Sequence, residues 1–429
     1  MYHKITITKE FKAAYKAMNE TVDLIFLTGR AGTGKSTLLN YFRKETKKKH
    51  VVLAPTGVAA LNVKGQTIHS FFGFHPAVTP KLVRKAFPNS LPLFKALDTI
   101  VIDEISMVRA DLLDCIDKAL RLNRERPKEP FGGVQMIFIG DLYQLPPVVT
   151  TEESYRFESE YSSPYFFSAY VMNGLNVRMI ELQTVHRQKE SSFVQLLDNL
   201  RTDRVSPQDI QTWNTRHEPY FDPQDDPGYI HLTTTNKMAK TRNDYELNQL
   251  PGKMWKLKAH TIGELPDRRM PSEELLTVKE GARIMFTTND SDRRWVNGTL
   301  GTISHIHKKA LSKSPTLEVG LEDERTVTVT PFKWEMFEYG HNGEVIQEAV
   351  VGSYTQYPIT LAWAVTIHKA QGKTFDRVLV DIGWGTFAHG QLYVALSRCT
   401  TFNGLVLLKP FKTKDVILDQ AVVEFMKQP

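Results

Sequence analysis

The stretch that most constrains the fold is "GRAGTGKST", residues 29–37, which fits the pattern G-x-x-x-x-G-K-[ST]. It follows an apolar, strand-like run, "DLIFLTG", and overlaps the start of an apolar helical run, "TLLNYF". A strand, a glycine-rich loop and a helix in this order form a phosphate-binding loop, because the backbone N–H groups of the loop surround phosphates. The pattern therefore predicts an α/β fold with a nucleotide site formed by Gly29, Gly32, Thr33, Gly34, Lys35, Ser36 and Thr37.

Two further loops supply the polar groups that such a site needs. The run "TIVIDEISM" places Asp103 and Glu104 where a strand ends, which is the edge at which ligands bind in open α/β sheets. We expect Lys35 to contact the β- and γ-phosphates, Ser36 and Asp103 to hold Mg²⁺, and Glu104 to polarise the attacking water. The run "FIGDLYQLPPV" adds Gln144, whose neutral amide could sense the γ-phosphate.

Short apolar runs that end in Gly, Pro or acidic residues recur in two parts of the chain. In residues 1–170 they alternate with helical patterns, which predicts one α/β domain with a parallel sheet. A second series begins at "VRMIEL", so residues 171–250 and 356–429 are expected to form a second α/β domain. Residues 251–355 contain short β-rich runs separated by Gly, Asn and charged turns. They predict a small antiparallel barrel or sandwich inserted into the second domain.

Composition narrows the class of protein. The chain is 41% hydrophobic and 24% charged, which is typical of a folded globular protein and not of a disordered one. A net charge of +6 and a pI near 9.0 permit a polyanionic partner without requiring one. There is no signal-peptide pattern and no apolar run of membrane-spanning length, so we expect a cytoplasmic or nucleoid-associated protein without a membrane partner. Cys115 and Cys399 lack metal-site spacing and are expected to be buried thiols.

Taken in order, these stretches resemble the motifs of superfamily 1 helicases, and most of all the PIF family (petite integration frequency), which is related to RecD. The resemblance covers nearly the whole chain and rests on "GRAGTGKST", "APTGVAALNVKGQTIHSFFG", "IDEISM", "GDLYQLPPV", "VHRQ", "AWAVTIHKAQGKTFD" and "YVALSR". It implies two RecA-like P-loop domains with ATP and Mg²⁺ in the cleft between them, and an SH3-like fold for residues 251–355. It also implies a small hairpin at about 64–76 that faces the DNA fork; the alternative is a surface loop with buried phenylalanines.

The same resemblance assigns roles to single residues. It adds Arg187 and Arg398 to Lys35, Glu104 and Gln144 as catalytic groups, although Arg398 taken alone could be only a cation at a helix end. It places DNA contacts at Pro55, Thr56, Ala60, Thr67, His69 and Ser70 in the first domain, and at Thr234, Asn236, His368, Lys369 and Gln371 in the second. These are mostly hydroxyls and amides at turns into helices, and such groups suit phosphates better than base edges.

The expected function is therefore that of an ATP-dependent helicase. The resemblance implies movement in the 5′-to-3′ direction on single-stranded DNA, unwinding of duplex forks, G-quadruplex DNA as a further partner, and a compact, monomeric, bacterial-type core. One departure from the family is that no glutamine precedes Gln66, whereas family members carry one near the N-terminus that contacts adenine. Two alternatives remain open: an RNA-acting motor of the same superfamily, and an ATP-switched DNA-binding clamp that does not unwind.

Overall fold

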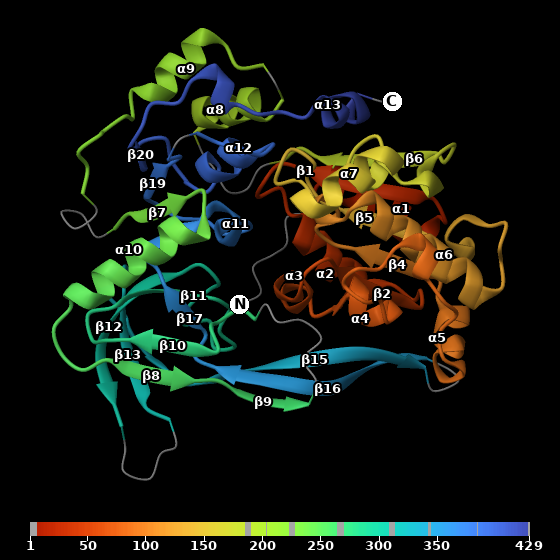
Figure 1. Cartoon of the computed structure of the whole chain (residues 1–429), viewed down its shortest axis with the longest axis horizontal. Coiled ribbons are helices and arrows are strands. Elements are labelled where there is room, and N and C mark those ends of the chain that lie inside the picture. The colour runs from red at the N-terminus through yellow and green to blue at the C-terminus, as the bar shows by residue number, and fades with distance from the viewer. Residues whose placement is uncertain are drawn as a thin grey trace.

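Three structural units form the molecule (Figure 1). The computed structural model describes residues 7–184, 190–202, 204–222, 228–263, 270–308, 314–341, 345–383 and 385–427. Two α/β units face each other, and a β-rich unit extends from the second unit beneath the first. Within these described residues, no helix combines the length and the apolar character needed to cross a bilayer.

The first domain is built on a six-stranded parallel sheet of strand order β3-β2-β4-β5-β1-β6. Its strands are β1 (Leu24–Gly29), β2 (His50–Ala54), β3 (Gln66–Thr67), β4 (Thr99–Ile102), β5 (Gln135–Ile139) and β6 (Val177–Leu182). Its helices are α1 (Lys9–Glu20), α2 (Lys35–Glu45), α3 (Gly57–Asn62), α4 (Ile68–Phe72), α5 (Leu91–Ala96), α6 (Ala110–Arg124) and α7 (Thr151–Glu160). Because alternate strand residues point to opposite faces, Ile25 and Leu27 pack under α1 and α2, whereas Phe26 packs under the other helices.

The second domain contains a four-stranded parallel sheet of strand order β18-β7-β19-β20. The strands are β7 (Ile230–Thr233), β18 (Ala364–Thr366), β19 (Val378–Asp381) and β20 (Leu405–Leu407). The helices are α8 (Ser191–Arg201), α9 (Pro207–Asn214), α10 (Asn236–Gln249), α11 (Ile367–Ala370) and α12 (Gln391–Leu396). Leu145, from the first half of the chain, is buried in this core, so the loop after β5 reaches into the second domain.

The expected boundary between residues 170 and 171 is wrong. Strand β6 pairs with β1 over its whole length and forms the edge of the first sheet, and Leu182 is buried in the core of that domain. The run "VRMIEL" has the composition of either sheet, and only its pairing with β1 decides to which it belongs. The chain also returns to the first domain at its end, where α13 (Gln420–Met426) buries Val422 and Phe425 against it.

The β-rich unit is inserted where the sequence predicts. A five-stranded antiparallel sheet has the order β14-β13-β12-β11-β17, with β11 (Arg283–Phe286), β12 (Leu300–His307), β13 (Thr316–Leu321), β14 (Thr326–Val329) and β17 (Ile359–Leu361). Beside it lie the pair β8 (Trp255–Lys258) and β10 (Leu275–Val278), and a three-stranded sheet of β9 (His260–Gly263), β15 (Phe332–His341) and β16 (Ile346–Gln356). Since β16 ends at Gln356 and β17 joins the same unit, the unit extends past the expected limit of 355.

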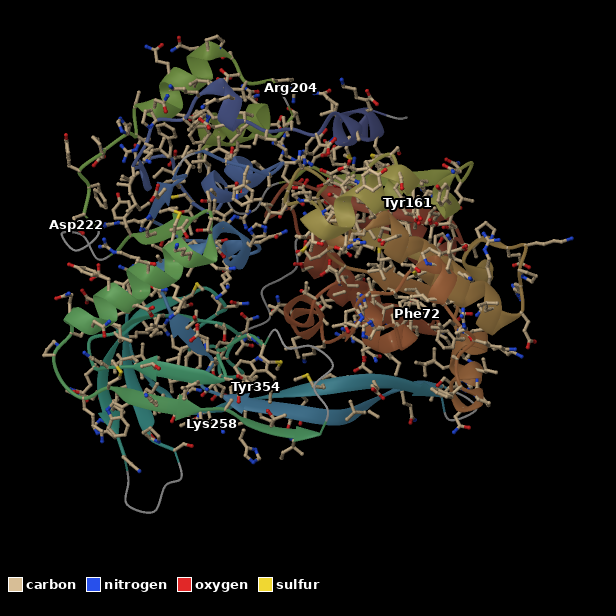
Figure 2. All side chains as sticks on the ribbon, in the orientation of Figure 1. Phe72, Tyr161, Arg204, Asp222, Lys258 and Tyr354 are labelled. Atoms are coloured by element: carbon tan, nitrogen blue, oxygen red, sulfur yellow. The ribbon has the colours of Figure 1, made fainter. Side chains whose placement is uncertain are left out.

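The antiparallel pair β15–β16, which we name the long hairpin, reaches from the β-rich unit under the first domain as far as α5 (Figure 1). Figure 2 places Tyr354 near its base and Phe72 in the first domain above its far end. Tyr339 anchors this far end: its hydroxyl accepts a hydrogen bond from the backbone N–H of Val52 at 3.2 Å, and its ring meets Phe71 edge to face. The long hairpin is therefore packed on the first domain.

The hairpin expected at residues 64–76 is absent, although the structure describes this whole segment. Gln66 and Thr67 instead form β3, which pairs in parallel with β2, and α4 begins directly after it. The physical reason is local capping, since the Thr67 hydroxyl accepts a hydrogen bond from the Ser70 N–H and starts the helix. Phe71 is buried against Phe94, so the segment is closer to the alternative of a surface turn with buried phenylalanines.

Candidate nucleotide site and DNA-binding edges

The phosphate loop connects β1 to α2, as the sequence predicts. Gly34 caps α2 with φ 91°, a left-handed conformation that favours glycine. At Gly29, a Cβ atom would come within 2.5 Å of the Leu182 carbonyl oxygen, so only glycine fits under the neighbouring strand. The loop therefore keeps an open backbone for phosphates, with Ser36 and Thr37 exposed on the first helical turn.

Lys35 lies over the loop. Its ammonium donates hydrogen bonds to the carbonyl oxygens of Gly29 at 2.6 Å and Arg30 at 3.1 Å. Burial lowers the pKa of Lys35, and the nearby carboxylates of Asp141 and Glu104 oppose that shift. The ammonium is thus placed where an incoming phosphate would replace carbonyl oxygens as its partner.

Two carboxylates follow β4 at the same sheet edge. Burial raises the pKa of Asp103 to about 6, and burial together with the charge of Asp103 raises the pKa of Glu104 to about 7. Lys35 lowers the pKa of both groups. Carboxylate and hydroxyl oxygens are ligands that suit Mg²⁺, and Ser36 and Asp103 are the residues that would hold it.

Gln144 lies in the cleft and is held by residues of both domains. Its amide donates a hydrogen bond to Asp141 Oδ2 at 3.1 Å. From the second domain, the Gln371 amide donates to Gln144 Oε1 at 3.2 Å and to Glu104 Oε2 at 3.4 Å. Gln371 was predicted as a DNA contact, and in the structure its side chain lies against Glu104 and Gln144, two residues predicted to be catalytic.

The two predicted arginines have different outcomes. Arg398 is fully buried in the second domain, where it donates hydrogen bonds to the carbonyl oxygens of Val394 at 2.8 Å and Lys373 at 3.2 Å and to Ser397 Oγ at 2.8 Å. Its charge is one of the smaller influences that lower the pKa of Glu104. Arg187 lies outside the described residues.

The predicted DNA contacts of the first domain share one edge of its sheet. Thr56 follows β2 and Thr67 ends β3, and these strands are parallel neighbours. Each threonine caps a helix by accepting a backbone N–H, from Ala59 at 3.3 Å and from Ser70 at 3.2 Å. Because α3 and α4 follow these two strands, Pro55, Ala60, His69 and Ser70 belong to the same edge.

The second domain repeats this arrangement. Thr235 caps α10 and Thr366 caps α11, each by accepting a backbone N–H, after the parallel neighbours β7 and β18. The predicted contacts Thr234, Asn236, His368 and Lys369 lie around these two caps, and the last three are exposed. The caps themselves were missed, although a threonine between an apolar strand and a helix is a recognisable signal.

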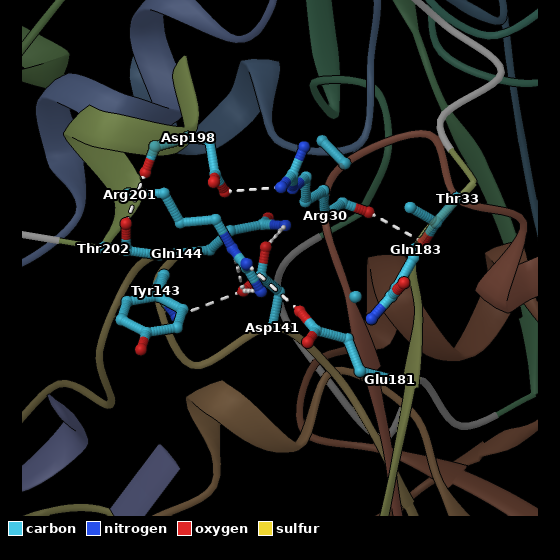
Figure 3. Close-up of polar contacts among 12 residues, drawn as sticks. Arg30, Thr33, Asp141, Tyr143, Gln144, Glu181, Gln183, Asp198, Arg201 and Thr202 are labelled. Carbon is cyan, nitrogen blue, oxygen red and sulfur yellow. Dashed lines mark hydrogen bonds and ion pairs between the residues drawn. The ribbon is translucent and has the colours of Figure 1, made fainter. Parts of the chain in front are cut away.

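A charged cluster centred on buried Arg201, which was not predicted from the sequence, joins the two domains (Figure 3). Arg201, at the end of α8, is 2% exposed and lies across the cleft from Asp141 and Glu181. One signal was available, since Arg201 is eight residues after Phe193 and so falls on the apolar face of an amphipathic helix. A charge on such a face needs a partner from another element.

Comparison with protein families gives two matches. Residues 6–210 match the family described as PIF1-like helicase, and residues 361–405 match the UvrD-like helicase C-terminal domain. The ATP-dependent DNA helicase Pif1 of Campylobacter jejuni is 30% identical, with 95% of each chain covered. The ATP-dependent DNA helicase PIF1 of Emericella nidulans is 32% identical over 97% of this chain, which spans 62% of that longer protein.

Solved structures of a Bacteroides Pif1 are also similar. The complex with ADP-AlF4 has a TM-score of 0.91 at 33% identity, with coverage of 99% of this chain and 97% of that chain. The unliganded form has a TM-score of 0.89 at 34% identity, with coverage of 98% and 96%. The form bound to single-stranded DNA has the lower TM-score of 0.70 at 34% identity, with coverage of 99% and 97%.

Proposed function

Because this chain belongs to the PIF1-like helicase family, we propose that it is an ATP-dependent DNA helicase that moves along single-stranded DNA and unwinds duplexes. One observation carries the proposal. The P-loop lysine and the carboxylates of the first domain share a cleft with Gln371 of the second domain. A site divided between two domains in this way responds when they move relative to each other.

The residues of the cleft have complementary roles. The loop N–H groups and Lys35 bind the phosphates of ATP, and Ser36 and Asp103 hold Mg²⁺, which neutralises phosphate charge. Glu104 in its ionised form orients the attacking water, and Gln144 senses the γ-phosphate. Arg398 adds positive charge from the second domain, and family resemblance proposes Arg187 as its companion.

The two capped sheet edges bind the DNA strand. N–H groups at the starts of α3, α4, α10 and α11 suit phosphates, and such contacts depend little on base sequence. When the cleft closes and opens in turn, the capped edge of one domain would move relative to that of the other, and the protein would advance stepwise along the DNA strand. Separating a base pair costs about 1.4 kcal/mol of stacking on average, which a cycle of ATP hydrolysis can supply.

DNA binding is proposed to change the arrangement of the domains. The structure is more similar to the Bacteroides Pif1 complex with ADP-AlF4 and to the unliganded form, at TM-scores of 0.91 and 0.89, than to the form bound to single-stranded DNA, at 0.70. Because identity and coverage are nearly equal in the three comparisons, we infer that the lower score reflects a different placement of the domains. We infer that this chain moves between two such arrangements.

The finer features of the proposal rest on family resemblance. They are the 5′-to-3′ direction, G-quadruplex DNA as a partner beside single strands and forks, a monomeric core, and a place in the bacterial cytoplasm with the nucleoid. A Bacteroides Pif1 crystallised with single-stranded DNA, and a structure described as two coordinating Pif1 helicases at forked double-stranded DNA, support single strands and forks as substrates. Sedimentation with and without DNA tests the monomer.

The decisive experiment is an unwinding assay in ATP and Mg²⁺ on two duplex DNA substrates, one with a single-stranded 5′ tail and one with a 3′ tail. Lys35→Ala is the control. We expect unwinding only from a 5′ tail and none by the variant. Unwinding from a 3′ tail alone would reverse the direction. DNA-stimulated ATPase without unwinding on either substrate would favour the clamp, and stronger stimulation by RNA strands would favour an RNA-acting motor.

A further inference from the structure

Arg201 of α8 connects the second domain to the loop that carries Gln144, residues 141–145, which we name the sensor loop. Its guanidinium lies 3.3 Å from Asp141 Oδ1 and 3.2 Å from Glu181 Oε1, and it stacks over the Tyr143 ring at 4.6 Å from the centroid (Figure 3). All three partners belong to the first domain. Arg201 therefore binds the first domain through two ion pairs and one cation–π contact.

The contact leads on to the catalytic groups. Asp141 Oδ1 also accepts the Tyr143 N–H at 3.2 Å, and Asp141 Oδ2 accepts the Gln144 amide at 3.1 Å. Asp141 therefore fixes both the backbone and the side chain of the sensor loop while Arg201 holds Asp141. The same carboxylate is the charge that most opposes the lowered pKa of Lys35.

A second ion pair on α8 repeats the contact one turn earlier. Asp198 lies 2.8 Å from Arg30, which belongs to the phosphate loop. Residues three apart on a helix share a face, so Asp198 and Arg201 present a negative and a positive charge side by side. Asp198 pairs with Arg30 and Arg201 pairs with Asp141, so each charge on α8 meets the opposite charge in the first domain.

We propose that Arg201 is a positioning residue for ATP hydrolysis: from the second domain it holds Asp141, and through Asp141 it sets the sensor loop and Gln144. This inference rests on the proposed function. Asp141 is fully buried, and a buried carboxylate that loses its partner is costly unless water reaches it. When the cleft closes, Arg201 completes the sensor loop; when the cleft opens, the pair separates and Gln144 loses its fixed orientation. Hydrolysis is then restricted to the closed arrangement.

The test compares Arg201→Ala, Asp141→Asn and the double variant with Arg204→Ala as a matched control. Arg204 follows α8 and pairs with Asp198, but its side chain is 63% exposed. We expect each single variant to lower the kcat of DNA-stimulated ATPase by about 10²-fold, the loss typical of a misplaced catalytic group, with a much smaller change in KM for ATP. The double variant should be no slower than the slower single variant, because the two residues act as a unit. Arg204→Ala should behave as the wild type.

A second measurement needs no turnover. The midpoint of thermal unfolding without nucleotide should fall in both single variants, and their effects should not add. Arg201→Lys keeps the charge but loses the planar, stacked geometry, so it should recover only part of the kcat. If Arg201→Ala does not fold, Tyr143→Leu, which removes the stacked ring, should still lower kcat more than it raises KM.

Wild-type kcat in folded Arg201→Ala, or additive losses in the double variant, would overturn the inference and leave the proposed function intact. A loss of kcat/KM in Arg201→Ala that comes only from a higher KM, with kcat unchanged, would also overturn it, because Arg201 would then be a binding group. If the wild type and Arg204→Ala both lacked DNA-stimulated ATPase, the proposed function would fail and the inference with it.

Discussion

Lys35 gives the simplest prediction at the scale of a single residue. Its hydrogen bonds run to the carbonyl oxygens of the loop after β1, and it begins α2, whereas the proposed DNA-binding edge of this domain follows β2 and β3. Lys35→Ala should therefore abolish ATPase and unwinding while single-stranded DNA affinity without nucleotide stays near wild type. ATPase assays and fluorescence anisotropy measure the two effects. A folded variant that loses DNA affinity would show that the two sites are not separate.

Arg398 is expected to have two roles, which one variant can separate. Its three hydrogen bonds inside the second domain mean that Arg398→Ala leaves buried acceptors unpaired, at a cost of about 1–3 kcal/mol. Its charge also reaches Glu104, and an arginine that stabilises phosphate charge contributes about 10³ to 10⁵ in rate in other enzymes. We expect a lower thermal midpoint and, well below it, turnover reduced by orders of magnitude. Normal turnover with a lowered midpoint would leave Arg398 a structural role only.

At the scale of elements, the segment that leads into α12 is held by a histidine with a fixed tautomer. His389 is buried; its Nε2–H donates to the Leu142 carbonyl at 2.7 Å, and its Nδ1 accepts the Asp419 N–H at 2.8 Å. A proton on Nδ1 would face the N–H of Asp419, so that hydrogen bond would be lost. Burial is the main reason that the pKa of His389 is lowered, although the Leu142 carbonyl and the charges of Asp419 and Asp141 raise it.

The sign of the pH effect follows from that shift. Above pH about 6.5 both the folded and the unfolded chain hold this histidine neutral; below it the unfolded chain takes up the proton first, so the free energy of unfolding falls. We expect the thermal midpoint to drop between pH 7.5 and 5.5, and to drop less in His389→Gln than in the wild type. The exposed His75→Gln serves as the control. An equal drop in all three proteins would contradict the role of His389.

The elements also show what the sequence could predict. The phosphate loop, Asp103 and Glu104 were predictable because a strand, a loop and a helix that adjoin in the chain form them. Strand β6 was assigned to the wrong sheet because its partner β1 is about 150 residues away, and an apolar strand fits either sheet. The contacts of Gln371 and Arg201 with the first domain were not predicted for the same reason: their partners lie in the other domain, and no local spacing reveals contacts between domains.

At the scale of the whole molecule, binding of single strands should depend on salt rather than on sequence. The two capped edges offer backbone N–H groups, hydroxyls and exposed Lys369, which contact phosphates. The logarithm of affinity should fall linearly with the logarithm of salt, with a slope of about −0.7 per phosphate neutralised. Anisotropy titrations with unstructured strands of equal length measure this. A flat salt response, or strong preference for one sequence, would contradict these edges as the DNA track.

The long hairpin lies beside part of the proposed DNA track. Ala60 and Thr67, two predicted DNA contacts, line the same pocket as Met336 and Phe337 of β15. Besides Tyr339, an ion pair of 2.8 Å between Arg43 and Glu348 holds the hairpin on the first domain. We expect a DNA strand bound at this edge to displace the hairpin. The proposed rearrangement on DNA binding therefore includes release of the hairpin. The apparent DNA affinity is then the affinity of the released form multiplied by the fraction of molecules in that form.

Weakening the dock should then strengthen DNA binding. In Tyr339→Ala combined with Glu348→Ala, the hydrogen bond to Val52, the ring contact and the ion pair are all removed, so the released fraction rises. We expect the Kd for single-stranded DNA, measured by anisotropy without nucleotide, to fall several-fold, with a faster association rate. Arg325→Ala, which removes the exposed pair with Asp323 at the far side of the β-rich unit, should leave both unchanged. Weaker binding by the double variant would mean that the docked hairpin is part of the DNA site, because DNA would then gain contacts from it instead of competing with it.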